Sequence, residues 1–334
     1  MAFPGGRFRV VAVMQKRALG RTGLSVSPIG FGAWGIGGFV PGASYGKTDD
    51  AVSKAALRRA FERGIDFVDT APAYGDGHSE ELIGETLAEM PQADADRIVV
   101  GTKAGQPRFA DPVDFSPEAI KRSAEASLKR LRRTAIDLLQ LHNATPELLR
   151  ERPEILGALD DLRKAGTIRA WGLSMKSPAE AKIGIAEFGA PVVQANYNVI
   201  DHRAADCGLF DAAAKAGASV IARTPLAFGF LSGNLSADAV FPEGDHRRQW
   251  PKERLALWAK AARDFIGDIA SREKQSLAQI ALRFCLSRPE VATTIPGMLR
   301  PEEADLNVAA GEAGALTQAD LDRIARDYKA SAFA

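Results

Sequence analysis

Four polar residues of the types that transfer protons stand at, or just after, the ends of short β-rich segments. Asp69, Lys103 and His142 each end such a segment, and Tyr74 follows Asp69 in the stretch DTAPAYGDG. Together they form a proton-transfer group that lacks a paired nucleophile and base. This combination predicts proton exchange with a substrate rather than covalent catalysis.

Tyr74 is the candidate acid of this group. A tyrosine hydroxyl is a poor proton donor at neutral pH because its pKa is about 10. A neighbouring ammonium stabilises the phenolate and lowers that pKa, so we expect Lys103 to activate Tyr74 and Asp69 to orient Lys103. His142 would hydrogen-bond a substrate carbonyl, and the hydride would come from a cofactor. The sequence therefore predicts carbonyl reduction.

Each of these residues also has an ordinary structural explanation when it is considered alone. Asp69 could cap the following turn, and Lys103 or His142 could be a solvated strand end. Tyr74 could be a common loop aromatic. Their joint occurrence at three consecutive strand ends favours one shared site. No metal site is predicted, because the histidines lack paired ligand spacing. They are His78, His142, His202 and His246.

Short β-rich segments alternate with helical stretches from residue 28 to the end. We count eight strand segments, of which seven precede a clear helical stretch. They lie at 29–34, 65–69, 97–103, 136–142, 168–174, 192–197, 219–223 and 291–295. Such alternation implies parallel strands, and eight units over about 300 residues favour an α/β fold of the (β/α)8 barrel class. The active site of such a barrel lies at the C-terminal ends of the strands, where the polar residues stand.

The domain organisation is simple. Residues 1–14 are expected to form a disordered extension without the pattern of a signal peptide, and 15–330 a single barrel domain. An N-terminal β-hairpin should precede the barrel, and two extra helices are predicted at 252–270 and 315–330. The helix predicted at 116–132 begins with the capping sequence SPE.

The composition is that of an ordinary globular protein. Of 334 residues, 46% are hydrophobic and 25% are charged, and 43 Lys and Arg balance 42 Asp and Glu. No net field would attract nucleic acid or an anionic membrane, and no apolar run approaches the roughly 18 residues of a membrane span. Two cysteines, Cys207 and Cys285, suit a reducing cytoplasm. We expect a cytoplasmic protein without nucleic-acid or membrane partners, and its oligomeric state is left open.

The stretch GFGAWG at 30–35 matches a dinucleotide-binding fingerprint, with Asp49 and Asp50 near the spacing of a ribose-binding acid. That mechanism needs a helix to begin at the third glycine. Here the chain continues as IGGFVPGASYG, which cannot form a helix. We therefore predict a glycine-rich loop at the barrel mouth instead.

At these residues the sequence resembles the aldo-keto reductase family, from about residue 15 to 329. The matching stretches are LGRTGLSVSPIGFGAW, GIDFVDTAPAYGDGHSEELIGE, the Lys103 strand, SPEAIKRSAEASLKRLRRTAIDLLQLH, WGLS, VVQANYNVI, IARTPLAFGFLSG and IPGMLRPEEADLN. The resemblance implies a barrel that binds NADPH or NADH without a dinucleotide fingerprint. It also implies a catalytic tetrad of Asp69, Tyr74, Lys103 and His142.

The resemblance further assigns residues to the nicotinamide end of the cofactor. Ser174 and Gln194 match the positions that hold the carboxamide, and Arg223 matches a position beside the cofactor. We also expect Trp34 to contact the cofactor. Where many members have Asn after the serine, this chain has Met175, so one amide contact is missing.

The adenosine end matches the loop that begins at Gly297 and the helix start as far as Asn307, which would reach adenine. The family's basic residue for the 2′-phosphate is replaced by Leu299, and the cation falls one place later, at Arg300. Glu303 replaces a frequent Gln, and a carboxylate suits ribose hydroxyls better than phosphate. We therefore expect a cofactor of NADP(H) or NAD(H), with weakened preference for NADPH.

Substrate contacts are expected from loops 104–115 and 226–250 and from the tail. Their aromatic residues, with Trp34, are Phe109, Phe115, Phe228, Phe230 and Trp250, and most of these could equally be packing residues. Apolar walls around a few polar groups suit a small aldehyde, ketone or sugar. Two alternatives share the same residues: a cofactor-binding regulatory subunit with little turnover, and a sugar or pyridoxal dehydrogenase that works in the oxidative direction.

Overall fold

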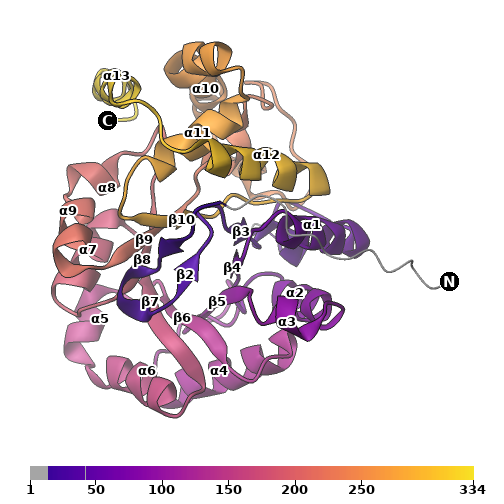
Figure 1. Cartoon of the computed structure of the whole chain (residues 1–334), viewed down its shortest axis with the longest axis vertical. Helices are drawn as coiled ribbons and strands as arrows, with labels where there is room; N and C mark the ends of the chain where they lie inside the picture. The colour runs from indigo at the N-terminus through magenta and orange to yellow at the C-terminus, as the bar shows by residue number, and fades with distance from the viewer. Residues whose placement is uncertain (1–13, 42) are drawn as a thin grey trace.

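Eight parallel strands form one curled sheet in a computed structural model of the chain, which describes residues 14–41 and 43–334. Hydrogen bonds of 2.9 Å from Gly30 N to Thr294 O and from Gly32 N to Pro296 O join its two edges, so the predicted (β/α)8 barrel is confirmed (Figure 1). The strands are β3 (Phe31–Gly32), β4 (Phe67–Asp69), β5 (Val99–Ala104), β6 (Ile136–His142), β7 (Ile168–Ser174), β8 (Val192–Asn196), β9 (Ser219–Arg223) and β10 (Val291–Thr294).

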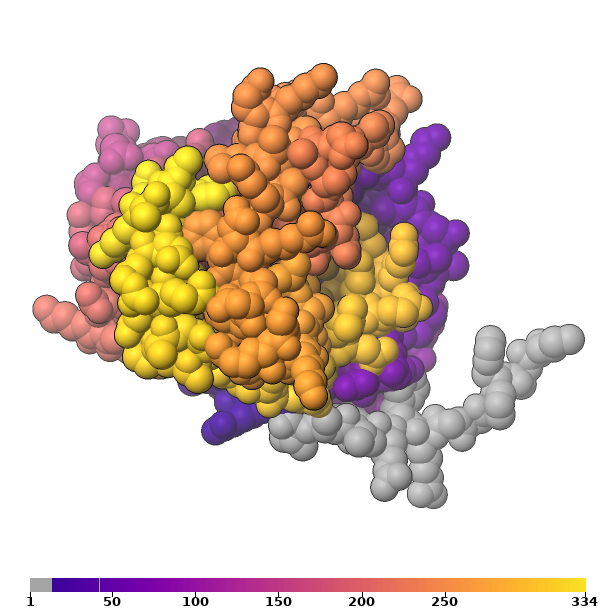
Figure 2. Space-filling view, turned by 90° about the horizontal axis from the view of Figure 1, so that it is seen from above, coloured from indigo at the N-terminus to yellow at the C-terminus, as the bar shows by residue number. Residues whose placement is uncertain are grey.

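Helices surround the sheet, as crossover connections between parallel strands require (Figure 1). They are α1 (Asp50–Glu62), α2 (His78–Ala88), α3 (Gln92–Ala95), α4 (Pro117–Leu131), α5 (Pro146–Glu151), α6 (Glu154–Lys164), α7 (Pro178–Ala186), α8 (Arg203–Asp206), α9 (Leu209–Ala216), α10 (Lys252–Glu273), α11 (Leu277–Leu286), α12 (Pro301–Ala313) and α13 (Gln318–Lys329). The two extra helices that the sequence predicts are α10 and α13. Figure 2 shows them side by side on one outer face, where Arg323 Nη2 donates to Asp268 Oδ1 at 2.8 Å.

Local sequence signals account for several helix boundaries. The Ser116 hydroxyl accepts a hydrogen bond from the backbone N–H of Ala119 at 3.2 Å and so caps α4, as predicted. Gly166 and Gly217 adopt positive φ values of 74° and 61° and end α6 and α9 just before a strand. A left-handed residue at this place favours glycine, so these stops were readable from the sequence.

The loop after β3 is the glycine-rich segment that mimicked a nucleotide fingerprint. A short 3-10 turn (Gly35–Gly37) follows it, and the first α-helix begins only at Asp50, capped by Asp49. Strand β3 is therefore shorter than the expected 29–34, because the chain turns after Gly32, although Ala33 N still donates to Asp69 O at 2.9 Å. No α-helix begins at Gly35, which agrees with rejecting the fingerprint.

The N-terminal end of the barrel is covered by the predicted hairpin, formed by β1 (Arg17–Ala18) and β2 (Ser25–Val26). Leu19 and Val26 are fully buried against the residues that fill the barrel interior, among them Phe67 and Leu138. This apolar plug occupies one end of the barrel and leaves the C-terminal ends of the strands to form the pocket.

The expected extension at residues 1–14 lies outside the described residues except for Met14. Met14 is buried in the core beside Ile29 and Gly311. Among the helices of residues 14–41 and 43–334, none is long and apolar enough to cross a membrane.

Candidate active site

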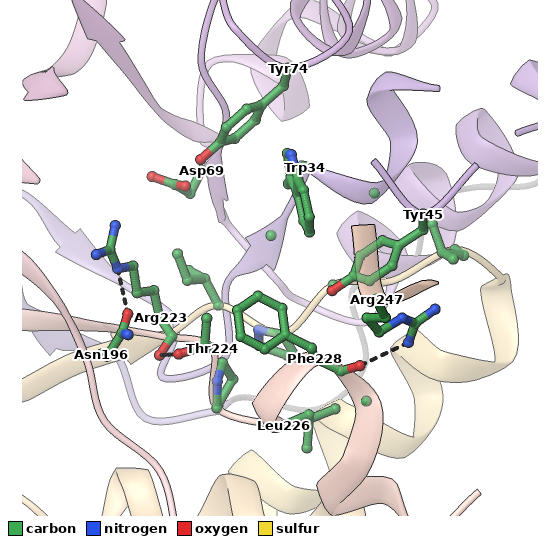
Figure 3. A pocket seen from close by; sticks show the side chains of 18 of the residues that line it. Trp34, Tyr45, Asp69, Tyr74, Asn196, Arg223, Thr224, Leu226, Phe228 and Arg247 are labelled. Carbon is green, nitrogen blue, oxygen red and sulfur yellow. Dashed lines mark hydrogen bonds between the residues drawn. The ribbon is translucent and has the colours of Figure 1, made fainter. Parts of the chain in front are cut away.

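A pocket of about 630 Å³ opens at the C-terminal ends of the strands. Asp69, Tyr74 and His142 line it, together with Gln194 and Arg223. Figure 3 shows Asp69 and Tyr74 on one side of the space and Arg223 beside them. The barrel thus brings together residues that lie far apart in the sequence, at the place that the strand ends predict.

Lys103 lies fully buried beneath this surface. Its ammonium donates to Asp69 Oδ2 at 2.8 Å, to the carbonyl oxygen of Thr70 at 2.8 Å and to Tyr74 Oη at 3.0 Å. These three acceptors use all three of its protons. The predicted grouping of Asp69, Tyr74 and Lys103 is therefore present as one hydrogen-bonded chain.

The protonation of Tyr74 differs from the sequence expectation. Burial raises the pKa of Tyr74 above its ordinary value, and the charge of Lys103 only partly offsets this effect. Burial also opposes the charge of Lys103, but Asp69 and Tyr74 outweigh it and raise the pKa of Lys103. Tyr74 is thus a neutral phenol beside a charged ammonium at neutral pH, which is the state that a proton donor needs.

His142 stands edge-on to the ring of Tyr74, with 6.2 Å between the ring centroids. Burial, reinforced by the charges of Lys103 and Arg223, holds the pKa of His142 well below its usual value. Its Nδ1 is buried without a hydrogen-bond partner among the described residues. We assign the ring proton to Nε2, because an unpaired lone pair is easier to bury than an unpaired N–H.

Asp69 is held by two amides that donate to its Oδ1 atom. Gln194 Nε2 donates at 2.7 Å and Gln140 Nε2 at 3.1 Å. Sequence reasoning missed Gln140, although its place two residues before His142 puts both side chains on the same face of β6. The Oε1 atom of Gln140 is buried without a partner in the described part of the chain.

The residues expected at the nicotinamide end lie together. Ser174 is buried and donates to Gln194 Oε1 at 3.4 Å, beneath the pocket rather than in its lining. Arg223 donates from Nε to Asn196 Oδ1 at 2.6 Å and from Nη2 to the carbonyl oxygen of Met175 at 2.8 Å. Burial lowers the pKa of Arg223. Met175 therefore contributes its backbone, while its side chain packs in the core.

The residues expected at the adenosine end are partly in the pocket. Gly297, Leu299 and Glu303 line it, whereas Arg300 is exposed outside the lining and Asn307 is buried in α12. Glu303 Oε2 accepts hydrogen bonds from the backbone N–H groups of Leu299 at 2.6 Å and Arg300 at 3.2 Å. Glu303 thus caps the start of α12 with its own carboxylate.

The loop aromatics divide into wall and packing residues. Trp34, Phe109 and Phe228 line the pocket. The Phe109 ring lies 6.3 Å from the Tyr74 ring and 6.2 Å from the His142 ring. The sequence left open which of these aromatics line the pocket, and the other three pack elsewhere. They are Phe115, buried against Gly105, Phe230, fully buried, and Trp250, stacked on Phe230.

Sequence reasoning also missed a clasp between two loops at the pocket rim. Ser44 forms an isolated parallel bridge with Asp245, and His246 N donates to Ser44 O at 3.0 Å. Tyr45 and Arg247 extend from this clasp into the pocket lining (Figure 3). No group of three metal-binding side chains occurs in the described ranges.

Comparisons with known proteins agree with this geometry. The profile of the Aldo/keto reductase family matches residues 28–328. The "NADH-specific methylglyoxal reductase" of Escherichia coli (strain K12) is 27% identical over 89% of this chain and 93% of its own length. The "L-galactose dehydrogenase" of Arabidopsis thaliana is 31% identical over 89% of this chain and 88% of its own.

A solved structure with a similar fold is the glycerol dehydrogenase AKR11B4 from Gluconobacter oxydans. It superposes with a TM-score of 0.77 at 27% sequence identity and covers 96% of both chains.

Proposed function

Because the chain belongs to the aldo/keto reductase family, we propose that it interconverts an aldehyde or ketone and an alcohol, with Tyr74 as the general acid and base. It is an NAD(P)-dependent oxidoreductase that acts on small carbonyl or alcohol substrates. One observation carries the assignment of Tyr74: its hydroxyl is bonded to a buried Lys103–Asp69 pair at 3.0 Å and also lines the pocket.

The residues of the pocket fit a nicotinamide dinucleotide. Gln194 offers an amide, and Arg223 carries a positive charge that only neutral acceptors meet within the described residues. This donor set suits a carboxamide and an anionic ligand. Ser174 supports Gln194, while Gly297, Asn307 and the exposed Arg300 would serve the adenosine end. When bound, the cofactor supplies or accepts the hydride.

The residues of this chain would handle the proton. In reduction, Tyr74 donates its phenol proton to the carbonyl oxygen, and the Nε2–H of His142 donates a second hydrogen bond to that oxygen. Lys103 stabilises the phenolate that remains, and Asp69 keeps Lys103 charged and in place. In oxidation Tyr74 must first lose its proton, and the phenolate, stabilised by Lys103, then accepts the proton of the alcohol.

Substitution of Tyr74 tests this proposal. Tyr74→Phe is expected to lower kcat by at least about a hundredfold with an aldehyde and NAD(P)H, because a phenyl ring donates no proton. Cofactor affinity, measured by fluorescence titration, should be unchanged. Tyr328→Phe, far from the pocket, is the matched control and should retain full activity. Activity of Tyr74→Phe within a few-fold of the parent would show that another group is the acid.

The same assay determines the reaction direction and tests whether the protein is a regulatory subunit with little turnover. Reduction of aldehydes and oxidation of alcohols with NAD(P)⁺ are measured side by side. A regulatory subunit would turn over neither, so measurable turnover that depends on Tyr74 excludes that alternative.

We also propose that the preference for NADPH is weak. Glu303 occupies the backbone N–H groups that an anion would use at the start of α12, and its charge repels phosphate. Leu299 supplies no cation beside it. An NADPH preference above roughly a hundredfold in kcat/KM, about 2.7 kcal/mol, would contradict this.

A further inference from the structure

A layer of polar side chains crosses the barrel interior just beneath the pocket. Asp69, Gln140 and Gln194 come from the alternate strands β4, β6 and β8, and all three are buried. The residues two places earlier on the same strands belong to an apolar interior cluster and are Phe67, Leu138 and Val192. Side chains two residues apart on a strand point to the same face, so the polar group forms the next layer of the interior. Barrel interiors are filled mainly by apolar layers, so a polar layer calls for an explanation.

The two glutamines of this layer meet at one oxygen of Asp69. Gln194 Nε2 donates to Asp69 Oδ1 at 2.7 Å, and Gln140 Nε2 donates to the same atom at 3.1 Å. The other oxygen, Oδ2, accepts a hydrogen bond from Lys103 Nζ at 2.8 Å. The carboxylate thus has separate partners on its two oxygens and cannot rotate without breaking a bond. This arrangement keeps Oδ2 on Lys103, which donates in turn to Tyr74 Oη at 3.0 Å.

Only one of the two glutamines can be reached by a ligand in the pocket. Gln194 lines the pocket, and Ser174 donates to its Oε1 atom at 3.4 Å. Gln140 is fully buried and is not among the described residues that line the pocket. A ligand that binds the Gln194 amide can weaken its bond to Asp69, whereas no ligand in the pocket reaches Gln140. Gln140 is therefore the donor to Asp69 that stays constant.

Packing alone does not explain a glutamine at position 140. Its Oε1 atom is buried without a hydrogen-bond partner in the described part of the chain, and an orphaned acceptor costs free energy. A methionine of similar length would fill the same space without that cost. Among the described residues, the Gln140 side chain forms one hydrogen bond, and its acceptor is Asp69. The amide group therefore acts on Asp69.

The bond from Gln140 to Asp69 also bears on Tyr74 through charge. Burial raises the pKa of Tyr74, Lys103 lowers it, and the negative charge of Asp69 raises it again. Figure 3 shows the Asp69 carboxylate beside the Tyr74 hydroxyl. An N–H donor on Oδ1 offsets part of the carboxylate charge and holds Oδ2 against Lys103. Loss of the Gln140 donor would make the phenolate less stable by both routes.

We propose that Gln140 is a positioning residue for proton transfer by Tyr74. It holds Oδ1 of Asp69, and so keeps Lys103 directed at Tyr74 while a ligand engages Gln194. It touches neither substrate nor cofactor and acts through Asp69 alone. The proposal rests on the proposed function, because it takes Tyr74 as the group that exchanges the proton.

Gln140→Met tests this role by removing the amide while keeping the length of the side chain. The kcat/KM for oxidation of glycerol or butan-1-ol at saturating NAD(P)⁺ is measured from about pH 6 to about pH 10. This rate rises with the fraction of phenolate and levels off above the apparent pKa of Tyr74. In Gln140→Met that pKa should be higher by about one pH unit, the equivalent of one neutral hydrogen bond. The plateau should stay within a few-fold of the parent, and the Kd for NAD(P)H should be unchanged.

A second measurement does not depend on turnover. Carbon-13 NMR of protein labelled at the tyrosine Cζ atoms reports the protonation of each of the four tyrosines. The Tyr74 signal is assigned by its loss in Tyr74→Phe. In the complex with NAD(P)⁺, this signal should begin to shift at a higher pH in Gln140→Met than in the parent. Gln140→Leu provides the same comparison with a second apolar side chain, should Gln140→Met fail to fold.

Gln279→Met is the matched control. Gln279 is a buried glutamine of α11 outside the pocket lining, and its Nε2 donates to Leu306 O at 3.1 Å. Its replacement also removes a buried amide but leaves Asp69 untouched, so neither the pH profile nor the Tyr74 signal should move.

Two results would overturn the role of Gln140. The first is that Gln140→Met and the parent have equal pH profiles and equal Tyr74 spectra over this range. The second is a plateau lowered more than about tenfold at an unchanged pKa, which would make Gln140 a packing residue. If Tyr74→Phe retains the activity of the parent, the proposed function fails instead. The NMR comparison then still decides whether Gln140 acts on Tyr74.

Discussion

Tyr74 sits between two opposing influences, and their balance sets its chemistry. Enclosure in the pocket disfavours the phenolate, while Lys103 at 3.0 Å favours it. Enclosure is the larger effect, so the phenol keeps its proton in the absence of substrate. Lys103 becomes important once the proton has left, because it then faces a phenolate in a medium of low polarity. The ammonium thus supports the product of proton transfer.

The Lys103–Asp69 ion pair should also affect the stability of the protein, because each of the two buried charges depends on the other. Lys103→Met leaves Asp69 as an unpaired buried carboxylate, and we expect a loss of about 3–5 kcal/mol in the free energy of unfolding. Lys103→Met combined with Asp69→Asn removes both charges and should recover much of that loss. Urea denaturation measures all three proteins. A single variant as stable as the parent would mean that the carboxylate is not confined as the structure places it.

At the level of elements, the strand ends were predictable and the loop directions were not. Asp69, Lys103 and His142 could be grouped because parallel strands of a barrel end at one face. No comparable rule predicts whether an aromatic side chain in a loop points into the pocket or into the core. Phe228 reaches the pocket through left-handed backbone and a hydrogen bond from Arg247, while nearby Phe230 turns into the core.

The clasp around Tyr45 was missed for a related reason. Its partners are separated by about two hundred residues, since His246 N binds Ser44 O. A contact between residues so far apart in the sequence leaves no signal in local periodicity or spacing. Gln140 differs, because its strand was predicted correctly and its spacing from His142 would have placed it on the same face, but its role as a partner of Asp69 was overlooked.

The start of α12 should control cofactor choice. Glu303→Gln keeps an oxygen that can accept from Leu299 N and Arg300 N but removes the negative charge. We expect kcat/KM with NADPH to rise severalfold relative to NADH, because the repulsion between two negative charges a few ångströms apart in water is worth about 1 kcal/mol.

A matched change on the same helix gives the control. Glu302, exposed and outside the pocket lining, is replaced by Gln and should leave the cofactor ratio unaltered. Urea denaturation of Glu303→Gln would confirm that the cap is retained. A lower ratio of NADPH to NADH efficiency in Glu303→Gln would contradict the repulsive role of the carboxylate.

At the scale of the whole molecule, the first and the last elements of the described chain both pack against the barrel. The hairpin plugs the N-terminal end, and α13 packs against the outside through Tyr328, whose ring stacks on His202 at 3.9 Å with an interplanar angle of 10°. Phe284 of α11 stacks near His202 at 5.1 Å. His202 therefore joins α13 to the barrel, and its buried ring makes this junction sensitive to pH.

Burial lowers the pKa of His202 to about 4, although a hydrogen bond to Val199 O and the charge of Asp206 act in the opposite direction. An unfolded histidine has a pKa of about 6.5, so between these values the unfolded chain binds the extra proton and stability falls as the pH decreases. From pH 7 to pH 5 this group should remove about 2 kcal/mol from the free energy of unfolding.

His202→Phe should abolish this part of the pH dependence, because phenylalanine keeps the stack and does not titrate. At pH 7 the variant should be less stable by no more than about 1 kcal/mol, the value of the lost hydrogen bond to Val199 O. At pH 5 it should equal or exceed the parent. Urea midpoints at the two pH values measure the difference, and the other titrating groups cancel because both proteins contain them. Parallel losses in parent and variant would show that His202 accepts its proton without disturbing the junction of α13 with the barrel.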